Sequence, residues 1–216
     1  MEQRKLQLFI ASSLDGYIAG RNGDLRRAEE IIDNAAKANC RLVDALIGII
    51  SPMLYQIGED WKSGILSVEG EHQFTSFCER TFDLVASKVQ AGKPTDLVRS
   101  NESEFLLMNA PGNEHTLAIR ILALWLVSKG KRAQIADAHL RLDELTTLVK
   151  TTKPKVLLIS MALAEQSKGV MAIAERIAEL PKPIRPRIIV GGYAVKLGLV
   201  PSIPGTDLMV DISTLT

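Results

Sequence analysis

Residues 104–118 read Glu104-Phe-Leu-Leu-Met-Asn-Ala-Pro-Gly-Asn-Glu-His115-Thr-Leu-Ala118. The apolar run that begins at Phe105 is continuous, as in a strand that is buried on both faces. Pro-Gly then marks a turn, and an apolar pattern at helical spacing follows to residue 129. A strand, a turn and a helix in this order indicate the first βα unit of a parallel sheet.

The same alternation continues to the end of the chain. It predicts strands at residues 104–109, 132–136, 155–160, 187–190 and 208–210, and helices at 115–129, 142–151, 165–180 and 193–199. Strands that alternate with helices indicate a doubly wound α/β domain. We therefore expect residues 104–216 to form a flavodoxin-like domain with five parallel strands in the order 2-1-3-4-5. Ligands of such sheets bind beyond the carboxyl ends of the strands.

Residues 1–92 have a different period and predict a four-helix bundle. The first helix should turn inward an apolar stripe made of Leu6, Phe9, Ile10, Leu14, Tyr17 and Ile18. The second should run from Leu25 to Ala38 after an Asp24 N-cap, with Ala28, Ile31, Ile32 and Ala35 inward. Polar, turn-rich residues 93–103 should form the linker between the two domains.

The other two bundle helices carry the same 3–4 spacing. The third should run from Arg41 to Trp61, and Pro52 should kink it or mark a turn near its start. The fourth should begin at a Ser67 cap and turn Phe74, Phe77, Phe82 and Val85 inward. Residues 5–20 also resemble the first strand and substrate loop of the dihydrofolate-reductase-like families. That likeness ends near residue 20, and the spacing fits a helix better, so we prefer the bundle.

The bulk properties exclude several classes of protein. The chain is 46% hydrophobic and 24% charged with a net charge of +1, so it lacks the concentrated positive field that nucleic-acid binding needs. Its two cysteines, Cys40 and Cys78, lie far apart and indicate neither a disulfide framework nor a zinc site. No signal peptide or membrane-spanning run is present. We expect a cytoplasmic protein that binds neither DNA nor membranes.

Polar and small residues follow the predicted strands, where a ligand would bind. His115 follows the first strand and His139 the second, Ser160 ends the third, and Gly191-Gly192 end the fourth. In the bundle, Trp61 is followed after nine residues by Glu71-His72. Each of these residues alone has an ordinary structural explanation, such as a helix start or a turn. Their joint order along the chain is more informative.

This order resembles the cobalamin-binding sensory modules of cobalamin-dependent photoreceptor regulators. The third helix adds Pro52-x-Leu54-x-x-Ile57-Gly58-x-x-Trp61. The resemblance implies a cobalamin cofactor, either adenosylcobalamin or methylcobalamin, with His115 as the cobalt ligand from below. It also implies that the following residues contact the cofactor: Trp61, Glu71 and His72 at the upper face of the corrin, Asn113, Thr116 and Leu117 around the histidine, and Ser160, Gly191 and Gly192 along the nucleotide tail.

The chain departs from the family in three places. Asn113 stands where the family has an acid; it can still orient the imidazole, but His115 should then be a weaker donor. Ala118 replaces a glycine of the family, and its methyl group should narrow the space through which the nucleotide tail of the cofactor enters the domain. Lys62 follows Trp61 where some photoreceptors have a second histidine ligand, so a light state with two histidine ligands is in doubt.

The resemblance leads to a light- or cobalamin-responsive sensor without catalytic residues. No DNA-reading helix precedes the bundle, so we expect signal transduction, and any transcription regulation, to act through a regulator or effector protein or through self-association. A corrinoid carrier protein of a methyltransferase system is the first alternative, and a cofactor-free interaction module is the second. A linear tetrapyrrole (a bilin) beside cobalamin also stays open.

Overall fold

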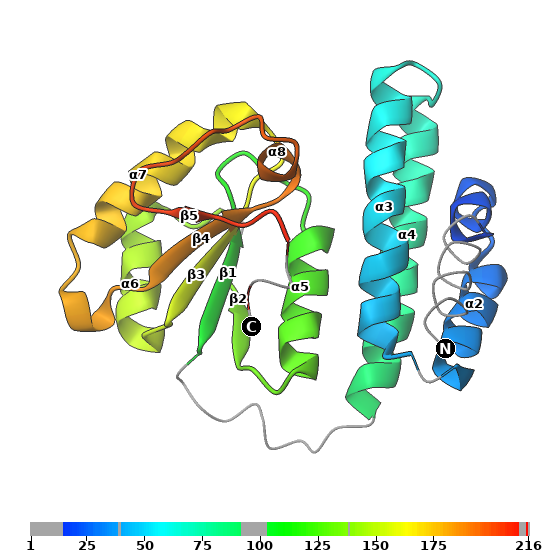
Figure 1. The fold of residues 1–216 in the computed structure, drawn as a ribbon, viewed down its shortest axis with the longest axis horizontal. Coiled ribbons are helices and arrows are strands. Elements are labelled where there is room, and N and C mark those ends of the chain that lie inside the picture. The colour runs from blue at the N-terminus through cyan, green and yellow to red at the C-terminus, as the bar shows by residue number, and fades with distance from the viewer. Residues whose placement is uncertain (1–14, 39, 92–102, 138, 212–214, 216) are drawn as a thin grey trace. The chain divides into compact units, whose positions relative to one another are not determined.

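The computed structural model describes residues 15–38, 40–91, 103–137, 139–211 and 215. The chain divides into two compact units, unit 1 (Met1–Lys93) and unit 2 (Pro94–Thr216). Figure 1 shows the fold of each unit. The first part of the predicted inward stripe, residues 6–14, lies outside the described residues. Most of the predicted linker, residues 93–102, also lies outside them.

Unit 2 contains a parallel sheet of five strands. They are β1 (Phe105–Asn109), β2 (Ala133–Ile135), β3 (Val156–Ser160), β4 (Arg187–Gly191) and β5 (Asp207–Leu208). Their spatial order is β2-β1-β3-β4-β5, and every neighbouring pair is parallel. This confirms the predicted flavodoxin-like order. The interior strand β1 is buried along its whole length, because helices cover both faces of the sheet.

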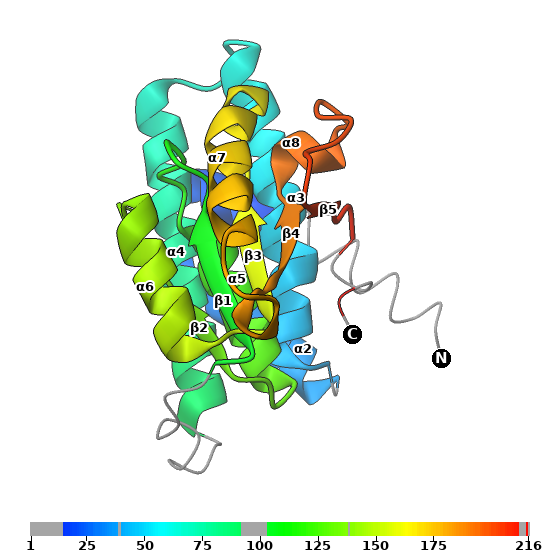
Figure 2. The ribbon, with the colours of Figure 1, turned by 90° about the vertical axis from the view of Figure 1, so that its left-hand side faces the viewer.

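The helices of unit 2 lie on opposite faces of this sheet. Helix α5 (Leu117–Ser128) covers one face, and α6 (Leu142–Thr152) and α7 (Ser167–Ala178) cover the other (Figures 1 and 2). The short helix α8 (Tyr193–Lys196) follows β4, and 3-10 turns occur at Ala164–Gln166 and Lys182–Ile184. Alternate residues of the strands build the core beneath α6 and α7, including Leu106, Met108, Leu157, Ile159 and Val190.

The described part of unit 1 consists of four helical segments. They are residues 15–22, α2 (Leu25–Lys37), α3 (Leu42–Lys62) and α4 (Val68–Ala91). The predicted caps form, because the Asp24 side chain accepts from the Arg27 N–H at 3.0 Å and the Ser67 hydroxyl accepts from the Gly70 N–H at 3.1 Å. The predicted inward residues of α2 and α4 are buried: Ala28, Ile31, Ile32, Ala35, Phe74, Phe77, Phe82 and Val85.

Two details of the bundle differ from the prediction. Ile18, expected inward, is 50% exposed, and the small residues Gly16, Ala19 and Gly20 face the bundle instead. Small residues are needed there because a Cβ on Gly20 would lie 2.3 Å from the Phe74 ring. Of the two outcomes predicted for Pro52, a kink or a turn, the turn is wrong, since α3 continues through that residue. Burial of neighbouring residues such as Ile50 and Met53 offsets the hydrogen bond that proline cannot make.

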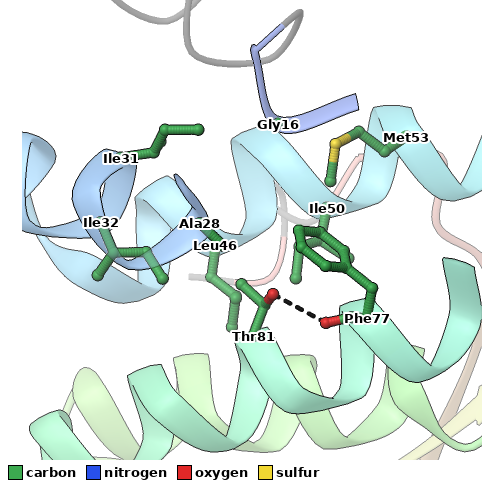
Figure 3. A pocket seen from close by; sticks show the side chains of 9 residues that line it. All are labelled: Gly16, Ala28, Ile31, Ile32, Leu46, Ile50, Met53, Phe77 and Thr81. Atoms are coloured by element: carbon green, nitrogen blue, oxygen red, sulfur yellow. Dashed lines mark hydrogen bonds between the residues drawn. The ribbon is translucent and has the colours of Figure 1, made fainter. Parts of the chain in front are cut away.

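The core of unit 1 contains one small apolar cavity among its described residues. Its volume is about 20 Å³, room for one water molecule at most. Figure 3 shows its walls, which come from all four helical segments: Gly16, Ala28, Ile31, Ile32, Leu46, Ile50, Met53, Phe77 and Thr81. The Thr81 hydroxyl donates to the Phe77 carbonyl at 2.8 Å, so the wall offers no free donor. We therefore regard the cavity as a packing gap.

No helix in the described part of the chain has the length and apolarity that crossing a bilayer requires.

Candidate functional site

Three strand ends meet at the carboxyl edge of the sheet in unit 2. Asn109 of β1 pairs with Ser160 of β3, and Ser160 pairs with Gly191 of β4. The residues that follow these three positions therefore start from neighbouring points on one edge. The sequence placed Ser160 and Gly191 there, and the register brings them together.

Asn113 anchors the loop that carries His115. Its side-chain Nδ2 donates to the Ser160 carbonyl at 3.0 Å, and its Oδ1 accepts from the His115 backbone N–H at 3.1 Å. Its own N–H donates to the Ala110 carbonyl at 2.9 Å. The resemblance implied that Asn113 orients the imidazole, whereas in the structure its side chain bonds main-chain groups. An aspartate could not make the bond to Ser160, because a carboxylate has no proton to donate to a carbonyl.

His115 lies at the exposed end of this loop. Within the described residues, its imidazole has no hydrogen-bond or ion-pair partner. The sequence placed His115 at the start of a helix, but α5 begins at Leu117 and Thr116 occupies the N-cap position without a side-chain bond. Leu117 is buried beneath the loop, and Ala118 is exposed. The imidazole is therefore free to bind a ligand.

The ends of β3 and β4 form a close backbone junction. The Met161 N–H donates to the Gly191 carbonyl at 2.8 Å, and the Ala194 N–H donates to the Met161 carbonyl at 3.3 Å. Gly192 has φ of +105°, and a Cβ there would lie 2.4 Å from the Met161 carbonyl oxygen. Only glycine fits this position, for both conformational and steric reasons. The Ser160 hydroxyl has no protein partner among the described residues.

Sequence reasoning missed two buried amides at this edge. Asn109 is 1% exposed; its Nδ2 donates to the Asn113 carbonyl at 2.9 Å, and its Oδ1 has no partner in the described part of the chain. Gln166 accepts through Oε1 from the N–H groups of Ala162 (2.9 Å) and Leu163 (3.0 Å) and so shapes the loop after β3. A polar residue at the end of an apolar strand was the available signal for Asn109. No comparable signal marked Gln166.

His139 occupies an equivalent place after β2. Its backbone N–H donates to Asp137 Oδ1 at 2.9 Å, the same type of turn that Asn113 makes with His115. The side chain is exposed. Within the part of this turn that the structure describes, His139 differs in that no side chain bonds a neighbouring strand as Asn113 bonds Ser160. It is therefore a matched comparison for His115.

The other residues that the sequence assigned to the cofactor site lie in unit 1, on either side of the connection between α3 and α4. Trp61 and Lys62 are the last residues of α3, and their side chains lie outside the described part of the structure. Glu71 lies in the first turn of α4, where its Oε1 accepts from the Thr75 hydroxyl at 2.8 Å. His72 is 74% exposed, with Nε2 at 3.6 Å from Glu71 Oε2. The turn brings these two stretches to the same end of the unit.

An apolar residue that the sequence did not single out shares this helix face. Val68 precedes Glu71 by three residues and His72 by four, so the three side chains lie on one side of α4. Val68 is 58% exposed, and Ile65 in the preceding turn is 69% exposed. Exposed apolar side chains beside a carboxylate and an imidazole give this end of the unit a mixed surface suited to a ligand that is itself partly apolar.

Residues 17–85, which include Trp61, Glu71 and His72, match the family described as B12 binding domain. The match supports cobalamin as the cofactor, in agreement with the prediction from the sequence. No curated protein matches the chain by sequence.

Solved structures add a likeness in fold. The monomethylamine corrinoid protein of Methanosarcina barkeri superimposes with a TM-score of 0.72 at 12% identity, over 92% of each chain. A cobalamin-binding protein from Desulfitobacterium hafniense DCB-2 gives a TM-score of 0.49 at 16% identity, over 94% of this chain and 92% of that one. The first of these confirms the fold over nearly the whole chain.

Proposed function

We propose that the chain is a cobalamin-binding carrier protein in which His115 is the cobalt ligand, and that it presents a methyl group to a partner methyltransferase. The observation that carries this proposal is the imidazole of His115, exposed at the carboxyl edge of the sheet without a partner among the described residues, on a loop fixed to Ser160. An imidazole nitrogen is a good donor to a metal of intermediate softness such as cobalt.

Other groups at this edge suit the nucleotide tail of the cofactor. The Ser160 hydroxyl is free to bond a polar atom of the tail. Gly191 and Gly192 form the close backbone junction with Met161 that shapes this edge, beside which the tail would lie. The Asn109 Oδ1 is a buried acceptor without a donor, as expected where a bound molecule or water completes a site. Thr116 and Leu117 follow the histidine directly at the start of α5, where the cofactor would lie close to them.

Unit 1 supplies the residues for the upper face of the corrin. When bound, cobalamin would supply a cobalt–carbon bond at that face. Val68 offers apolar surface for its alkyl group, Glu71 and His72 offer polar contacts, and Trp61 is assigned to the same face by its position at the end of α3. The hydroxyl of Thr75 donates to Glu71, and the imidazole of His72 is the more exposed member of the pair.

The lower loop departs from the loop that is typical of carriers and sensors alike. The acid that the photoreceptor family places two residues before its histidine is replaced here by Asn113, whose amide is engaged by backbone groups. A carboxylate at that position would accept a hydrogen bond from the imidazole and make it a stronger ligand for the metal, and this chain lacks one there. This departure does not separate a carrier from a sensor, so we rank the carrier first on the likeness in fold to a corrinoid protein.

The lower ligand is tested with His115→Ala beside the matched control His139→Ala. We expect wild type and His139→Ala to retain methylcobalamin on gel filtration with one absorbance spectrum. His115→Ala should give the spectrum of a cofactor without an imidazole ligand, or no retention. The same spectrum in all three proteins would contradict His115 as the ligand.

The carrier role is tested on protein loaded with hydroxocobalamin. The sample is reduced chemically, treated with methyl iodide and passed through gel filtration. We expect the cofactor to take up the methyl group and to stay bound through the cycle. Loss of the cofactor on reduction would contradict a carrier.

The sensor remains the second candidate, favoured by the spacing of Trp61, Glu71 and His72. It predicts that green light changes the hydrodynamic radius or the proteolysis pattern of protein loaded with an alkylcobalamin. We expect no such change from the carrier. A light-dependent change would reverse the order of the two proposals.

A further inference from the structure

A buried carboxylate lies directly before Trp61 in unit 1. Asp60 is 8% exposed. Its Oδ2 accepts from the Tyr17 hydroxyl at 2.6 Å, and its Oδ1 accepts from the Gln56 side-chain amide at 2.8 Å. The first bond joins α3 to the helical residues 15–22, across 43 positions of sequence. A buried charge is costly unless hydrogen bonds satisfy it, so its presence at this place calls for an explanation.

The backbone of the same residue holds the turn that leads to α4. The Asp60 carbonyl accepts from the N–H groups of Ile65 at 2.9 Å and Leu66 at 3.1 Å. The Ser63 hydroxyl donates to the same carbonyl at 3.1 Å. Asp60 therefore fixes the end of α3 through its side chain and fixes the following turn through its main chain.

Tyr17 extends this connection to α4. Its ring lies 6.0 Å from the Phe74 ring, centroid to centroid. Phe74 follows Glu71 by three residues and is almost fully buried. Gly20, one turn beyond Tyr17, allows the first helix to approach Phe74 closely. Tyr17 thus contacts both helices that carry the residues assigned to the upper face.

Two neutral donors hold most of the charge of Asp60, and the guanidinium of Arg21 lies near both members of the pair. The hydrogen bonds from Tyr17 and Gln56 lower the pKa of Asp60, and the bond to Asp60 raises the pKa of Tyr17. Both groups therefore keep one protonation state across the neutral range. Burying an ion contributes little net stability compared with an apolar contact, and its best attested use is to specify one arrangement.

We propose that Tyr17 and Asp60 are positioning residues for the upper face. Their hydrogen bond fixes the end of α3, which carries Trp61, relative to the start of α4, which carries Val68, Glu71 and His72. In this way it determines how strongly the protein distinguishes a cobalamin with an alkyl upper ligand from one with a small upper ligand. The inference rests on the proposed function, which assigns these residues to the upper face.

The test compares Tyr17→Phe with Lys88→Met. Tyr17→Phe removes only the hydroxyl and keeps the ring beside Phe74. Lys88→Met removes another long-range connection of the same unit, the bond from Lys88 Nζ to Asp33 Oδ1 at 2.6 Å. The first measurement is the ratio of the dissociation constants of adenosylcobalamin and hydroxocobalamin. The second, on protein without cofactor, is acrylamide quenching of tryptophan fluorescence, because Trp125, the only other tryptophan of the chain, is buried in unit 2.

Tyr17→Phe should shift the ratio against adenosylcobalamin about fivefold or more and should increase quenching. Lys88→Met should leave the ratio within about twofold of wild type, although it lowers the melting temperature. The inference is overturned if Tyr17→Phe and Lys88→Met give the same ratio and the same quenching. If wild type binds no cobalamin, the proposed function fails, and the quenching comparison alone decides whether the pair positions the end of α3.

Discussion

The two units hold their candidate residues by different means. In unit 2, the candidate residues are positioned mainly by the main chain. Strand register places Asn109, Ser160 and Gly191 side by side, and the side-chain amide of Asn113 bonds two backbone groups. In unit 1, the arrangement depends on side chains from separate helices, above all Tyr17 and Asp60. Backbone geometry tolerates change in most side chains, whereas a side-chain pair is lost with a single substitution. The comparison predicts which positions in each unit are sensitive.

The largest effect is expected at Gly192 in unit 2. Gly192→Ala places a Cβ against the Met161 carbonyl at a positive φ and should lower the free energy of unfolding by about 3 kcal/mol or more. The matched control is Gly130→Ala, which has φ of +77° and open space around its Cβ, and which should cost about 1 kcal/mol. Urea unfolding measures both. Equal losses would mean that the close approach to Met161 is relaxed in solution.

A smaller effect is expected from a change of charge in the histidine loop. Asn113→Asp replaces a donor to the Ser160 carbonyl with a carboxylate and should cost about 2 kcal/mol at pH 7. The loss should shrink in acid, where a protonated aspartic acid can donate again. The reverse change, Asp137→Asn, keeps the acceptor for the His139 N–H and should be nearly neutral. Unfolding curves at pH 4 and pH 7 check both variants, and similar costs at 113 and 137 would refute the anchoring role of Asn113.

The same comparison explains what the sequence could predict. Strand order and the edge position of Ser160, Gly191 and Gly192 follow from hydrophobic periodicity and from the geometry of parallel sheets, which depend on local pattern. The caps at Asp24 and Ser67 are local as well. The resemblance to cobalamin-binding modules supplied the cofactor, which the family match supports.

Hydrogen bonds between residues far apart in the chain could not be predicted from the sequence. No pattern indicates that Tyr17 bonds Asp60 or that Asn113 bonds Ser160, since the partners are 43 and 47 positions apart. Tyr17 was predicted only as part of an apolar stripe, and Ile18 in the same stripe proved exposed because small residues pack more closely on Phe74. Helical periodicity indicates that a face is buried, but it does not indicate which residues on that face let two helices approach.

A pH-dependent effect of intermediate size is expected in unit 1. The pKa of Asp60 lies below its ordinary 3.8, first because Tyr17 donates to it. A carboxylate with a lowered pKa contributes stability that is present above the unfolded pKa and is lost as pH falls through the folded pKa. Asp60→Asn should therefore cost about 1–2 kcal/mol at pH 7 and should flatten the loss of stability below about pH 4. Thermal unfolding between pH 2 and pH 7 measures this, and an unchanged acid slope would contradict the contribution of Asp60.

The smallest effect is expected from the chemical reactivity of the two cysteines of unit 1, which reports on the core of the bundle. Cys78 is fully buried on α4, and burial raises the pKa of its thiol from 9.0 to about 12. Since the thiolate is the reactive form, three pKa units reduce its amount about a thousandfold, and burial excludes the reagent as well. In the native protein at pH 8, an aromatic disulfide reagent should modify the half-buried Cys40 within minutes and leave Cys78 unmodified.

Cys40→Ser removes the fast phase of this reaction, so that the remaining rate of modification, that of Cys78, reports only how often the bundle opens. If Tyr17 fastens the first helix across Phe74, as its contacts indicate, Tyr17→Phe should raise this rate more than Lys88→Met does. Equal rates in the two variants would mean that the bundle opens at a place that Tyr17 does not control.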